Sequence, residues 1–341
     1  MKKVIITGGS GFIGSNLVDY LIKKKYFVIN IDKLTYSSNR YKNKIRNKKN
    51  YKLVKLDIVN KSKLIKIIKK NNPIAIFNLA AETHVDRSID GPKNFIHTNI
   101  YGTFNLLESL RFLKKKNINP KLIHISTDEV YGDIKINKRS NEDHKYEPSS
   151  PYSASKASAD HLVKSYIRTY KINAVISNCC NNYGPYQFPE KLIPKMLSNI
   201  FNNKILPIYA RGKNSREWIY VQDHCEALFT LYLKGKSGHS YNVGTGVNLS
   251  NINLVKKILK ICKLKKIEIG KNVKIKYVKD RPGHDFRYAL DSKKILKELK
   301  WRPKTKFNEG LNNTIEWYLN NKSFLNQISR KQYEFRLGLK G

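Results

Sequence analysis

The sequence predicts an α/β fold in which a doubly wound parallel sheet is followed by a smaller α/β lobe. In the first half of the 341-residue chain, short apolar runs alternate with amphipathic stretches, which is typical of strands joined by crossover helices. After about Gly184, prolines and loops separate shorter elements. We therefore expect residues 1–183 to form the first domain and residues 184–330 to form mainly the second lobe. A basic tail is expected over 331–341.

Each element of the first domain is predicted from its hydrophobic pattern. Apolar runs predict strands over 4–7, 27–31, 52–56, 74–80 and 122–126. Apolar residues at helical spacing predict helices over 12–22, 61–70 and 95–113. A further short run predicts a strand near 239–245 that returns to the first sheet. The boundary between the two units is therefore not expected to be a single point in the chain.

The chain has 66 Lys and Arg residues against 26 Asp and Glu residues, a formal net charge of +40. Such a charge ordinarily suggests nucleic acid as a partner. Here the lysines are spread over almost every predicted helix and loop, often beside Asn and Ile, which is typical of a compositional drift. We expect weak, salt-sensitive contact with polyanions, but no specific nucleic-acid binding.

Composition also restricts the compartment and the kind of site. No apolar run reaches the roughly 20 residues that a membrane helix needs, and glycines interrupt the apolar run near the N-terminus, which argues against a signal peptide. The four cysteines, Cys179, Cys180, Cys225 and Cys262, form no CxxC pair. We therefore expect a cytoplasmic protein with reduced thiols, no membrane contact and no metal site.

A glycine-rich turn joins the first predicted strand to the first predicted helix. Its residues, GGSGFIG from Gly8, satisfy both GxGxxG and GxxGxxG. Glycines let the backbone approach a pyrophosphate closely, and the helix N-terminus offers free N–H groups to the anion. In this strand–turn–helix context the motif predicts a dinucleotide-binding Rossmann domain. The expected contacts are Gly8, Gly11, Phe12, Ile13 and Gly14.

Asp32 ends the second predicted strand, where a carboxylate can accept hydrogen bonds from the adenosine ribose hydroxyls. Its charge would repel a 2′-phosphate, so the sequence favours NAD over NADP. The alternative is an ordinary aspartate in a turn. Asp57-Ile58 and Leu79-Ala80-Ala81 end the third and fourth strands, where an adenine contact and passage of the cofactor over small residues are expected. The remaining expected cofactor contacts are Lys33, Leu34, Thr35, Thr98, Tyr152, Lys156 and Asn182.

Tyr152 and Lys156 stand four residues apart, on one face of a predicted helix. A tyrosine that acts as a base near neutrality must lose about 3 units from its reference pKa of about 10. A neighbouring ammonium and a cationic nicotinamide ring can supply that shift. The alternative is an exposed amphipathic pair, since YxxxK is common by chance. The position of the pair after the fifth predicted strand favours a catalytic role.

Thr127, Asp128 and Glu129 follow the fifth predicted strand. A hydroxyl alone can polarise the reacting oxygen in simple dehydrogenases, so the two adjacent acids are additional. Elimination of water from a sugar needs a base for a carbon-bound proton and an acid for the departing hydroxide. Asp128 and Glu129 could divide these tasks, or they could be solvated acids in a turn.

Longer motifs connect these residues. The chain resembles the dTDP-glucose 4,6-dehydratases, a nucleotide-sugar family of the extended short-chain dehydrogenases, over nearly its whole length. The matching segments are TGGSGFIGS, DKLTY, NLAAETHVDRSI, STDEVYG, YSASKA, NNYGPYQFPEKLIP, LPIY and DRPGHDFRYALD. TDE together with PEKLIP and DRPGHD is far more specific than the glycine motif. The resemblance implies a homodimer with tightly held NAD that converts dTDP-glucose to dTDP-4-keto-6-deoxyglucose.

The resemblance also implies the catalytic roles. Tyr152 would deprotonate the C4 hydroxyl as hydride leaves C4 for NAD, while Thr127 holds the C4 oxygen. Glu129 would remove the C5 proton that the C4 ketone has acidified, and Asp128 would protonate the departing C6 hydroxyl. Hydride would then return to C6 and a proton to C5.

The substrate-binding residues that the resemblance implies lie mostly in the second lobe. They are Thr83, Thr127, Asn181, Glu190, Lys191, Leu192, Pro207, Ile208, Tyr209, Arg216, Asn251, Asp280, Arg281, Pro282, Gly283 and His284. Glu190 and Lys191 are expected near the sugar and diphosphate, residues 207–209 at the base, and Arg216 with residues 280–284 at the diphosphate and nucleoside. The chain departs from the usual motifs at Cys180, Phe286 and Val247-Asn248, and none of these changes removes a catalytic group.

Other classes of protein share the predicted cofactor site. A nucleotide-sugar 4-epimerase and a UDP-glucuronate decarboxylase are disfavoured by the acid pair, whereas a dehydratase acting on a UDP- or CDP-linked sugar stays open. A non-catalytic NAD- or RNA-binding protein is permitted by the charge, but the complete catalytic set argues against it. His84 and His124 are interpreted as packing or supporting residues rather than metal ligands.

Overall fold

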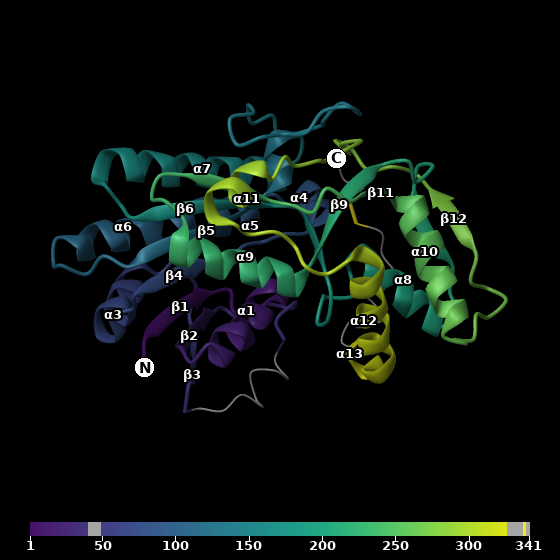
Figure 1. Cartoon of the computed structure of the whole chain (residues 1–341), viewed down its shortest axis with the longest axis horizontal. Coiled ribbons are helices and arrows are strands. Elements are labelled where there is room, and N and C mark those ends of the chain that lie inside the picture. Colours follow the sequence, from purple (N-terminus) through teal and green to yellow (C-terminus); the bar gives the residue numbers. More distant parts are fainter. Residues whose placement is uncertain (40–48, 326–336, 339–341) are drawn as a thin grey trace.

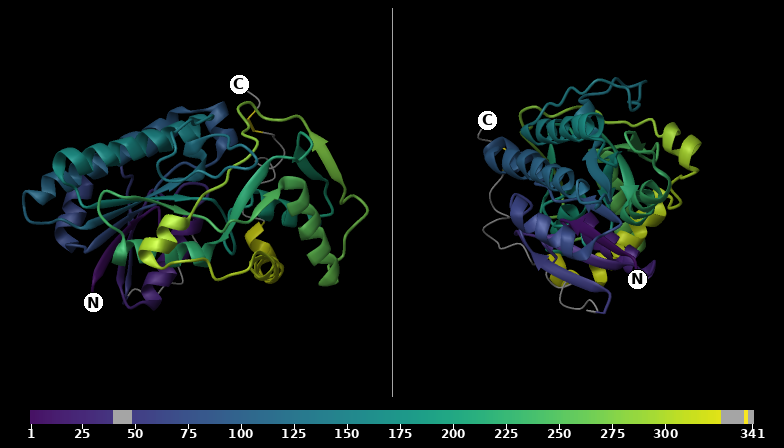
Figure 2. Two further views of the ribbon diagram at one scale, coloured as in Figure 1. Left: turned by 45° about the horizontal axis from the view of Figure 1, so that its top comes forward. Right: turned by 90° about the vertical axis from the view of Figure 1, so that its left-hand side faces the viewer.

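The structure is a computed structural model and is described for residues 1–39, 49–325 and 337–338. It confirms the predicted fold class, because helices cover both faces of a seven-stranded parallel sheet and a smaller lobe lies at one end of it (Figures 1 and 2). The basic tail expected over 331–341 lies almost entirely outside the described residues.

The large sheet has the strand order β10-β6-β5-β4-β1-β2-β3, and all of its neighbouring strands are parallel. Its strands are β1 (Lys3–Thr7), β2 (Phe27–Asp32), β3 (Tyr51–Lys55), β4 (Ala75–Asn78), β5 (Lys121–Thr127), β6 (Ala174–Cys179) and β10 (Ser240–Val243). The order reverses between β1 and β4. Ligands of such sheets bind in the crevice at the carboxyl ends of the strands at this point.

Alternate residues of the strands pack against different helices, as a sheet buried on both faces requires. In β1, Val4 and Ile6 belong to the apolar core beneath α1 (Phe12–Lys23), α9 (Val221–Lys234) and α11 (Lys293–Leu299). Ile5 belongs to the opposite core, beneath α3 (Lys61–Asn71), α6 (Gly102–Lys114) and α7 (Pro151–Tyr170). The apolar runs in the sequence therefore form strands because both of their faces are buried.

The predicted strands and helices of the first domain all occur, most with bounds within one residue of those expected, and two of them differ by more. The strand expected over 74–80 ends at Asn78, where the chain leaves the sheet. The helix expected over 95–113 is divided into α5 (Lys93–Phe95), the π-helix η1 (Ile96–Tyr101) and α6. Strand β6 was not predicted, and neither were two short helices, α4 (Val85–Asp90) and the 3-10 helix η2 (Asp128–Tyr131).

The second lobe has its own small sheets and its own apolar core. Strands β11 (Asn248–Ser250), β9 (Ser215–Tyr220) and β7 (Asn181–Tyr183) form one sheet in that order, and β8 (Leu206–Tyr209) pairs with β12 (Ile275–Val278). Its helices are α8 (Leu192–Phe201), α10 (Asn251–Leu264), α12 (Phe307–Asn320) and α13 (Lys322–Leu325). Apolar side chains from α8, α10 and α12 enclose this core.

The two units are interleaved along the chain. Helix α9 packs against α1, and β10 pairs with β6, with Tyr241 opposite Ser177. Strand β10 lies inside the range 239–245 expected for a returning strand. Helix α11 then packs beside β10. Three elements that follow residue 184 therefore belong to the layers of the first domain.

Two kinds of feature are absent from the residues that the structure describes. None of the helices there combines the length and the apolar character that a membrane span requires. No group of His, Cys, Asp and Glu side chains there could hold a metal ion. The four cysteines are buried and form no disulfide.

Candidate active site

The glycine turn lies at the carboxyl end of β1, where the strand order reverses. Gly8 has a φ of +72°, and a Cβ there would lie 2.7 Å from the backbone nitrogen of Ala80, so a larger residue would clash with the chain after β4. A Cβ on Gly11 would meet only the Gly8 carbonyl oxygen, at 3.4 Å. The outer side of the turn is therefore open. No side chain caps the first turn of α1, which leaves its N–H groups available to an anion.

A pocket of about 510 Å³, open solvent included, lies beside this turn. Asp32 accepts hydrogen bonds from the backbone nitrogens of Ser10 at 2.9 Å and Leu34 at 2.7 Å. Its carboxylate is thereby held between the glycine turn and the loop after β2. The predicted cofactor residues that line the pocket are Gly8, Gly11, Asp32, Lys33, Thr35, Asp57, Ile58, Leu79, Ala80, Ala81 and Thr98. The open turn, the free helix N-terminus and the strand-end carboxylate fit an adenine dinucleotide.

Helix α7 positions Tyr152 and Lys156. Its N-terminus is fixed by a capping box, in which Ser150 and Ser153 each accept a hydrogen bond from the backbone nitrogen of the other. Tyr152 and Lys156 follow on successive turns and are both buried. The Lys156 Nζ donates to the carbonyl oxygen of Ile125 in β5 at 2.6 Å, so the lysine side chain lies along the sheet.

A second pocket, of about 1170 Å³ with open solvent included, joins the first at the glycine turn. All five predicted catalytic residues line it, which are Thr127, Asp128, Glu129, Tyr152 and Lys156. Besides Gly8, Gly11, Leu79 and Ala81, which it shares with the first pocket, its other predicted residues are Phe12, Ile13, Gly14, Thr83, Asn181, Asn182, Glu190 and Lys191. The fold therefore brings the cofactor turn, the acid pair and the Tyr-Lys pair to one cavity.

Asp128 and Glu129 have different surroundings. Burial first, and then Glu129 and Glu217, raise the pKa of Asp128 well above the usual carboxyl range. Thr127 donates to one Asp128 oxygen at 3.1 Å, and the other oxygen is buried with no hydrogen-bond partner among the described residues. Burial also raises the pKa of Glu129, but Arg281 and other cations oppose that rise. The fold thus favours a protonated Asp128 beside a Glu129 that can ionise.

Tyr152 differs from the sequence-based expectation. Burial, followed by Glu129, raises its pKa well above that of an ordinary phenol, and a hydrogen bond with Thr127 opposes that rise. The surrounding side chains therefore do not produce the expected lowering. A base at this position needs a further positive charge near the phenol, which the nicotinamide ring of NAD would bring.

Arg216, in β9, lies close to the acid pair. Its guanidinium donates to the carbonyl oxygens of Asp285 at 2.9 Å and Ser215 at 2.8 Å, and it stacks 4.2 Å above the centre of the Tyr288 ring. Its charge also lowers the pKa of Glu129. These contacts hold a cation at the side of the cavity that faces the second lobe.

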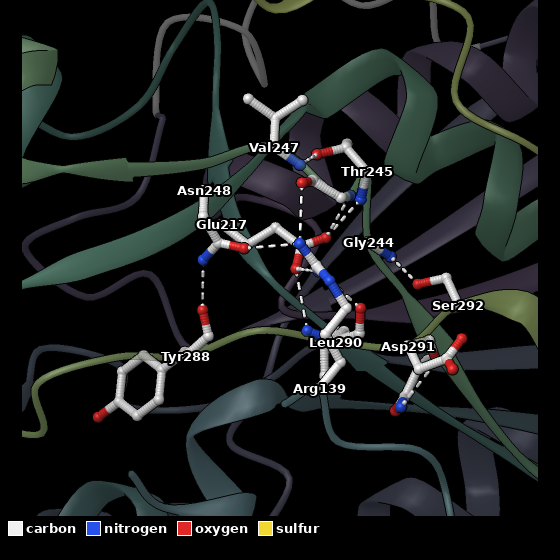
Figure 3. A network of polar contacts seen from close by, with 12 residues as sticks. Arg139, Glu217, Gly244, Thr245, Val247, Asn248, Tyr288, Leu290, Asp291 and Ser292 are labelled. Atoms are coloured by element: carbon white, nitrogen blue, oxygen red, sulfur yellow. Dashed lines mark hydrogen bonds and ion pairs between the residues drawn. The ribbon is translucent and has the colours of Figure 1, made fainter. Parts of the chain in front are cut away.

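Glu217, also in β9, is fully buried and holds the strand in place (Figure 3). Its carboxylate accepts hydrogen bonds from the backbone nitrogens of Thr245 at 2.6 Å, Gly246 at 2.7 Å and Leu290 at 2.9 Å. A fourth comes from the Arg139 guanidinium at 2.9 Å. Figure 3 shows that these donors come from separate segments, so one carboxylate joins three parts of the chain.

Tyr209 and Arg281 meet at Asp86 in α4. Asp86 accepts hydrogen bonds from the Arg281 guanidinium at 2.7 Å and from the Tyr209 hydroxyl at 2.6 Å. The His284 ring lies edge-on to Tyr209, and its Nδ1 is 2.6 Å from an oxygen of Asp280. Two predicted substrate residues therefore bind an aspartate that was not predicted, and two more, His284 and Asp280, lie next to Tyr209 and to each other.

Glu190 and Lys191 connect the second lobe to the first domain. Glu190 accepts hydrogen bonds from the Tyr36 hydroxyl at 2.9 Å and from Arg87 at 3.1 Å. Lys191 donates to the carbonyl oxygen of Thr83 at 2.8 Å. These contacts join the loop after β2, the segment around α4 and the start of α8 at the mouth of the cavity.

Several predicted residues line neither pocket. One is Leu34 of the cofactor set, and the others belong to the substrate set: Leu192, Pro207, Ile208, Tyr209, Arg216, Asn251, Asp280, Arg281, Pro282, Gly283 and His284. Ile208 is buried in the apolar core of the second lobe. The side chain of Asn251 has a buried oxygen with no hydrogen-bond partner among the described residues.

The comparisons agree with this geometry. A family model described as GDP-mannose 4,6 dehydratase matches residues 5–314. The dTDP-glucose 4,6-dehydratase of Escherichia coli is 45% identical over 360 residues, which cover 99% of each chain. The chain belongs to the dTDP-glucose 4,6-dehydratase family.

Solved structures of the family have the same fold. The Bacillus anthracis dTDP-glucose 4,6-dehydratase in complex with NAD is 41% identical, with a TM-score of 0.85 over 95% of this chain and 98% of that chain. The Streptomyces venezuelae enzyme DesIV, with NAD and TYD bound, is 38% identical, with a TM-score of 0.88 over 95% and 99%. The predictions of the family, of a hydro-lyase and of NAD as cofactor are confirmed.

The cavity also contains residues that were not among the predicted site residues. Ser126, Cys179, Cys180, Gln187 and Phe188 line the second pocket. Each lies within or next to a segment that carries the family resemblance, so position alone could have suggested them. Glu217 offers no such local signal, because its partners become neighbours only when the chain folds.

Proposed function

We propose that this chain catalyses the NAD-dependent dehydration of dTDP-glucose to dTDP-4-keto-6-deoxyglucose. The observation that carries the proposal is the presence of Asp128 and Glu129 in the same cavity as Tyr152 and Lys156. An epimerase or a simple dehydrogenase needs no pair of carboxyl groups in addition to the Tyr-Lys pair. The names of the family relatives support dTDP-glucose as the substrate.

The cofactor would lie along the first pocket. The open turn at Gly11 and the N-terminus of α1 would hold its pyrophosphate, and Asp32 its adenosine ribose. When bound, NAD supplies the acceptor for hydride from C4 and the donor of hydride to C6. We assign cofactor binding to residues 1–183 together with α9, β10 and α11, and substrate binding to most of the remainder up to residue 330.

Oxidation at C4 needs a base for the hydroxyl proton. Thr127 and Tyr152 line the same wall of the cavity, and we place the C4 oxygen between their hydroxyl groups. The Tyr152 phenolate accepts the proton, and the ammonium of Lys156 stabilises that phenolate. Because Tyr152 is buried among carboxyl groups, this step depends on positive charge close to the phenol.

Elimination then uses the acid pair. With a ketone at C4, the C5 proton becomes acidic, and Glu129 removes it. Asp128, whose surroundings favour the protonated form, donates its proton to the C6 hydroxyl as that group leaves. Water departs, and Glu129 returns the proton to C5 as C6 is reduced.

The substrate diphosphate would meet the cations around Glu129. Arg281, Arg216 and Lys191 all lower the pKa of Glu129, so their positive charges act electrostatically on the proposed base. Bound phosphate oxygens would take up much of that positive potential. We place the sugar against Glu190 and Asn181, and the nucleoside against residues 207–209 and 280–284.

We also propose a homodimer. Exposed apolar and aromatic side chains occur on η1, α6 and the end of α7, namely Ile96, Tyr101, Phe112 and Tyr170. Helices α6 and α7 pack side by side (Figure 1), so these side chains lie on adjoining elements that a second copy could cover. Light scattering of the purified chain measures this state. A cytoplasmic location is proposed because nucleotide sugars and NAD are metabolites of that compartment.

A panel of sugar nucleotides tests the proposed function. Each is incubated with the purified chain, and the products are scored by mass for the loss of one water. We expect dTDP-glucose to be dehydrated with a much higher kcat/KM than UDP-glucose, without accumulation of free NADH. Equal kcat/KM values for the two would overturn the nucleotide assignment, and oxidation without loss of water would overturn the dehydratase assignment.

A further inference from the structure

A row of buried polar side chains crosses the large sheet behind the catalytic helix. Thr7, Asn78 and His124 are register neighbours on β1, β4 and β5. Thr7 donates to the side-chain oxygen of Asn78 at 2.7 Å, and the Asn78 nitrogen lies 3.1 Å from His124 Nδ1. Because an amide nitrogen only donates, His124 Nδ1 accepts, and the ring proton is on Nε2. Burial lowers the pKa of His124, so the ring is neutral.

The row ends at Asp160 in α7, whose side chain is 0% exposed. One Asp160 oxygen lies 3.3 Å from His124 Nε2. The other accepts hydrogen bonds from the hydroxyls of Ser126 at 2.7 Å and Tyr146 at 3.0 Å. Although burial raises the pKa of Asp160, His124, Lys156 and Ser126 together hold it below the usual range. The group is therefore a buried carboxylate with two hydroxyl donors on one oxygen, while the other oxygen has the His124 ring close by but no hydrogen-bond partner among the described residues.

The spacing along α7 connects this anion to the catalytic pair. Tyr152, Lys156 and Asp160 stand four residues apart, so they follow one another along a single helix face. The lysine donates to the Ile125 carbonyl oxygen, which carries no full charge. A buried ammonium needs a counter-charge, and Asp160 lies one helical turn away.

We propose that Asp160 is a positioning residue for the oxidation at C4: it is the buried counter-ion that keeps the Lys156 side chain charged and aligned along β5 beside Tyr152. Asp160 lines neither pocket, so it acts through Lys156 and not on the substrate. The hydrogen bonds from Ser126 and Tyr146 fix the orientation of the carboxylate, and the His124 ring packs against its other oxygen. The inference rests on the proposed function, which gives Tyr152 and Lys156 their roles.

The other titratable groups near Lys156 do not replace this anion. Among the described residues, the other titratable groups that interact electrostatically with Lys156 are Cys179 in β6 and His124 in β5. Burial raises the pKa of Cys179 to about 12, so that thiol is neutral. The carboxyls of Asp128 and Glu129 face Tyr152, and Tyr131 and Tyr146 face Asp160.

The charge of Asp160 gives the proposal a measurable sign. Burial lowers the pKa of Lys156, and Asp160 is the largest influence that raises it. In Asp160→Asn, Lys156 should therefore lose its proton at a lower pH, and Tyr152 should lose its cationic neighbour with it. We expect the alkaline limb of C4 oxidation to move down by at least about 1 pH unit, with the NAD content unchanged. The matched control is Tyr146→Phe, which removes a donor to the same carboxylate but keeps its charge.

The readout is the absorbance of reduced nicotinamide after mixing each variant with dTDP-glucose across the pH range. An unshifted alkaline limb in folded Asp160→Asn, or an equal shift in Tyr146→Phe, would overturn the inference. Failure of the wild-type chain to oxidise or dehydrate dTDP-glucose would instead overturn the proposed function.

A thermal comparison covers the case in which Asp160→Asn does not fold. Lys156→Met leaves the buried carboxylate without its counter-ion, which is costly. Adding Asp160→Asn to Lys156→Met removes that unpaired charge. We expect the double variant to have a Tm equal to or above that of Lys156→Met. A clearly lower Tm would show that Asp160 is not the counter-ion of Lys156.

Discussion

At the scale of single residues, the site depends on two neighbouring carboxyl groups with unlike surroundings. Burial, Glu129 and Glu217 raise the pKa of Asp128, and Arg216 opposes them, whereas Arg281, Arg216 and Lys191 all lower the pKa of Glu129. When the surroundings shift the pKa values of two carboxyl groups by different amounts, one group can act as the acid and the other as the base. Their division of labour therefore follows from the surrounding charges and from burial.

The acid pair can be separated by substitution. Oxidation at C4 needs Tyr152, Lys156 and NAD but no base at C5, so Glu129→Gln should still reduce bound NAD on mixing with dTDP-glucose. Its net turnover should fall by about 10²–10⁴, the usual effect of losing a general acid–base group. Asp128→Asn should impair departure of the C6 hydroxyl, yet it should still exchange the C5 hydrogen with deuterated solvent. Nicotinamide absorbance and the C5 label measure the two steps.

Glu147→Gln is the control for charge removal, because Glu147 is exposed and lines neither pocket. It should keep wild-type turnover. Near-normal dehydration by Glu129→Gln would contradict the mechanism while leaving the fold and the cofactor assignment in place.

The raised pKa of Asp128 also predicts how stability depends on pH. A carboxyl whose folded pKa lies above its unfolded pKa favours folding at low pH, and this contribution is lost as pH rises through the folded value. Asp128→Asn keeps a side chain of the same size but removes the ionisable carboxyl group, so the variant should be more stable than the wild type at pH 8. The gain should shrink as pH falls toward 4. Paired Tm measurements across this range check the trend, and a gain that does not depend on pH would contradict it.

Residues with a local signal were predictable from the sequence, and residues defined by distant partners were not. The glycine turn and the Tyr152-Lys156 pair lie within short segments whose spacing alone carries their chemistry. Arg281 was predicted through its motif, but its partner Asp86 stands 195 positions away and was not predicted as a site residue. Asp160 likewise becomes a counter-ion only when α7 packs on β5.

At the scale of elements, most of the parallel strands were predicted from their apolar runs, but β6 was missed although all of its residues are buried. The helix over 95–113 was predicted as one element, yet it contains the π-helical segment η1. Gly102 follows that segment, and a Cβ there would lie 2.6 Å from the Ile58 side chain. Such a close approach between α6 and a distant loop has no signature in the helical periodicity.

Strand β9 shows how one buried charge supports a binding element. Glu217→Gln would replace a carboxylate by an amide whose NH₂ group faces donors, so at least one buried hydrogen bond would be lost. We expect a loss of about 3 kcal/mol in the free energy of unfolding. Because Arg216 precedes Glu217 in the same strand, KM for dTDP-glucose should rise more than kcat falls.

Glu226→Gln is the matched control, since Glu226 forms an ion pair with the exposed Lys304. Surface pairs contribute about 0–1 kcal/mol, so this variant should resemble the wild type in both Tm and KM. Denaturant unfolding and initial-rate kinetics measure the two effects. An unchanged KM in Glu217→Gln would show that the network stabilises the fold without positioning Arg216.

At the scale of the whole molecule, the chain passes between its two units more than once. Helix α9 and strand β10 return to the large sheet, and the chain then re-enters the second lobe through β11 and α10. The cavity lies where the units meet, and contacts such as Tyr36 with Glu190 join them across its mouth. Alternating apolar runs predicted the layers, but the interleaving depends on which surface α9 packs against, and periodicity does not encode that choice.

The net charge of +40 is a property of the whole molecule that would ordinarily suggest nucleic-acid binding. Because the basic residues are dispersed, we expect polyanion binding through phosphate contacts alone, with a Kd of about 10⁻⁴–10⁻⁶ M at physiological salt. Raising the salt from 50 to 200 mM should weaken it by roughly 10³ if six or more phosphates are contacted. Duplexes of unrelated sequence should bind equally, since base readout needs side chains placed in a groove.

Fluorescence anisotropy with two labelled duplexes across a salt series measures both properties. Tight binding of one sequence at physiological salt would show that the charge serves a nucleic-acid function in addition to dehydration.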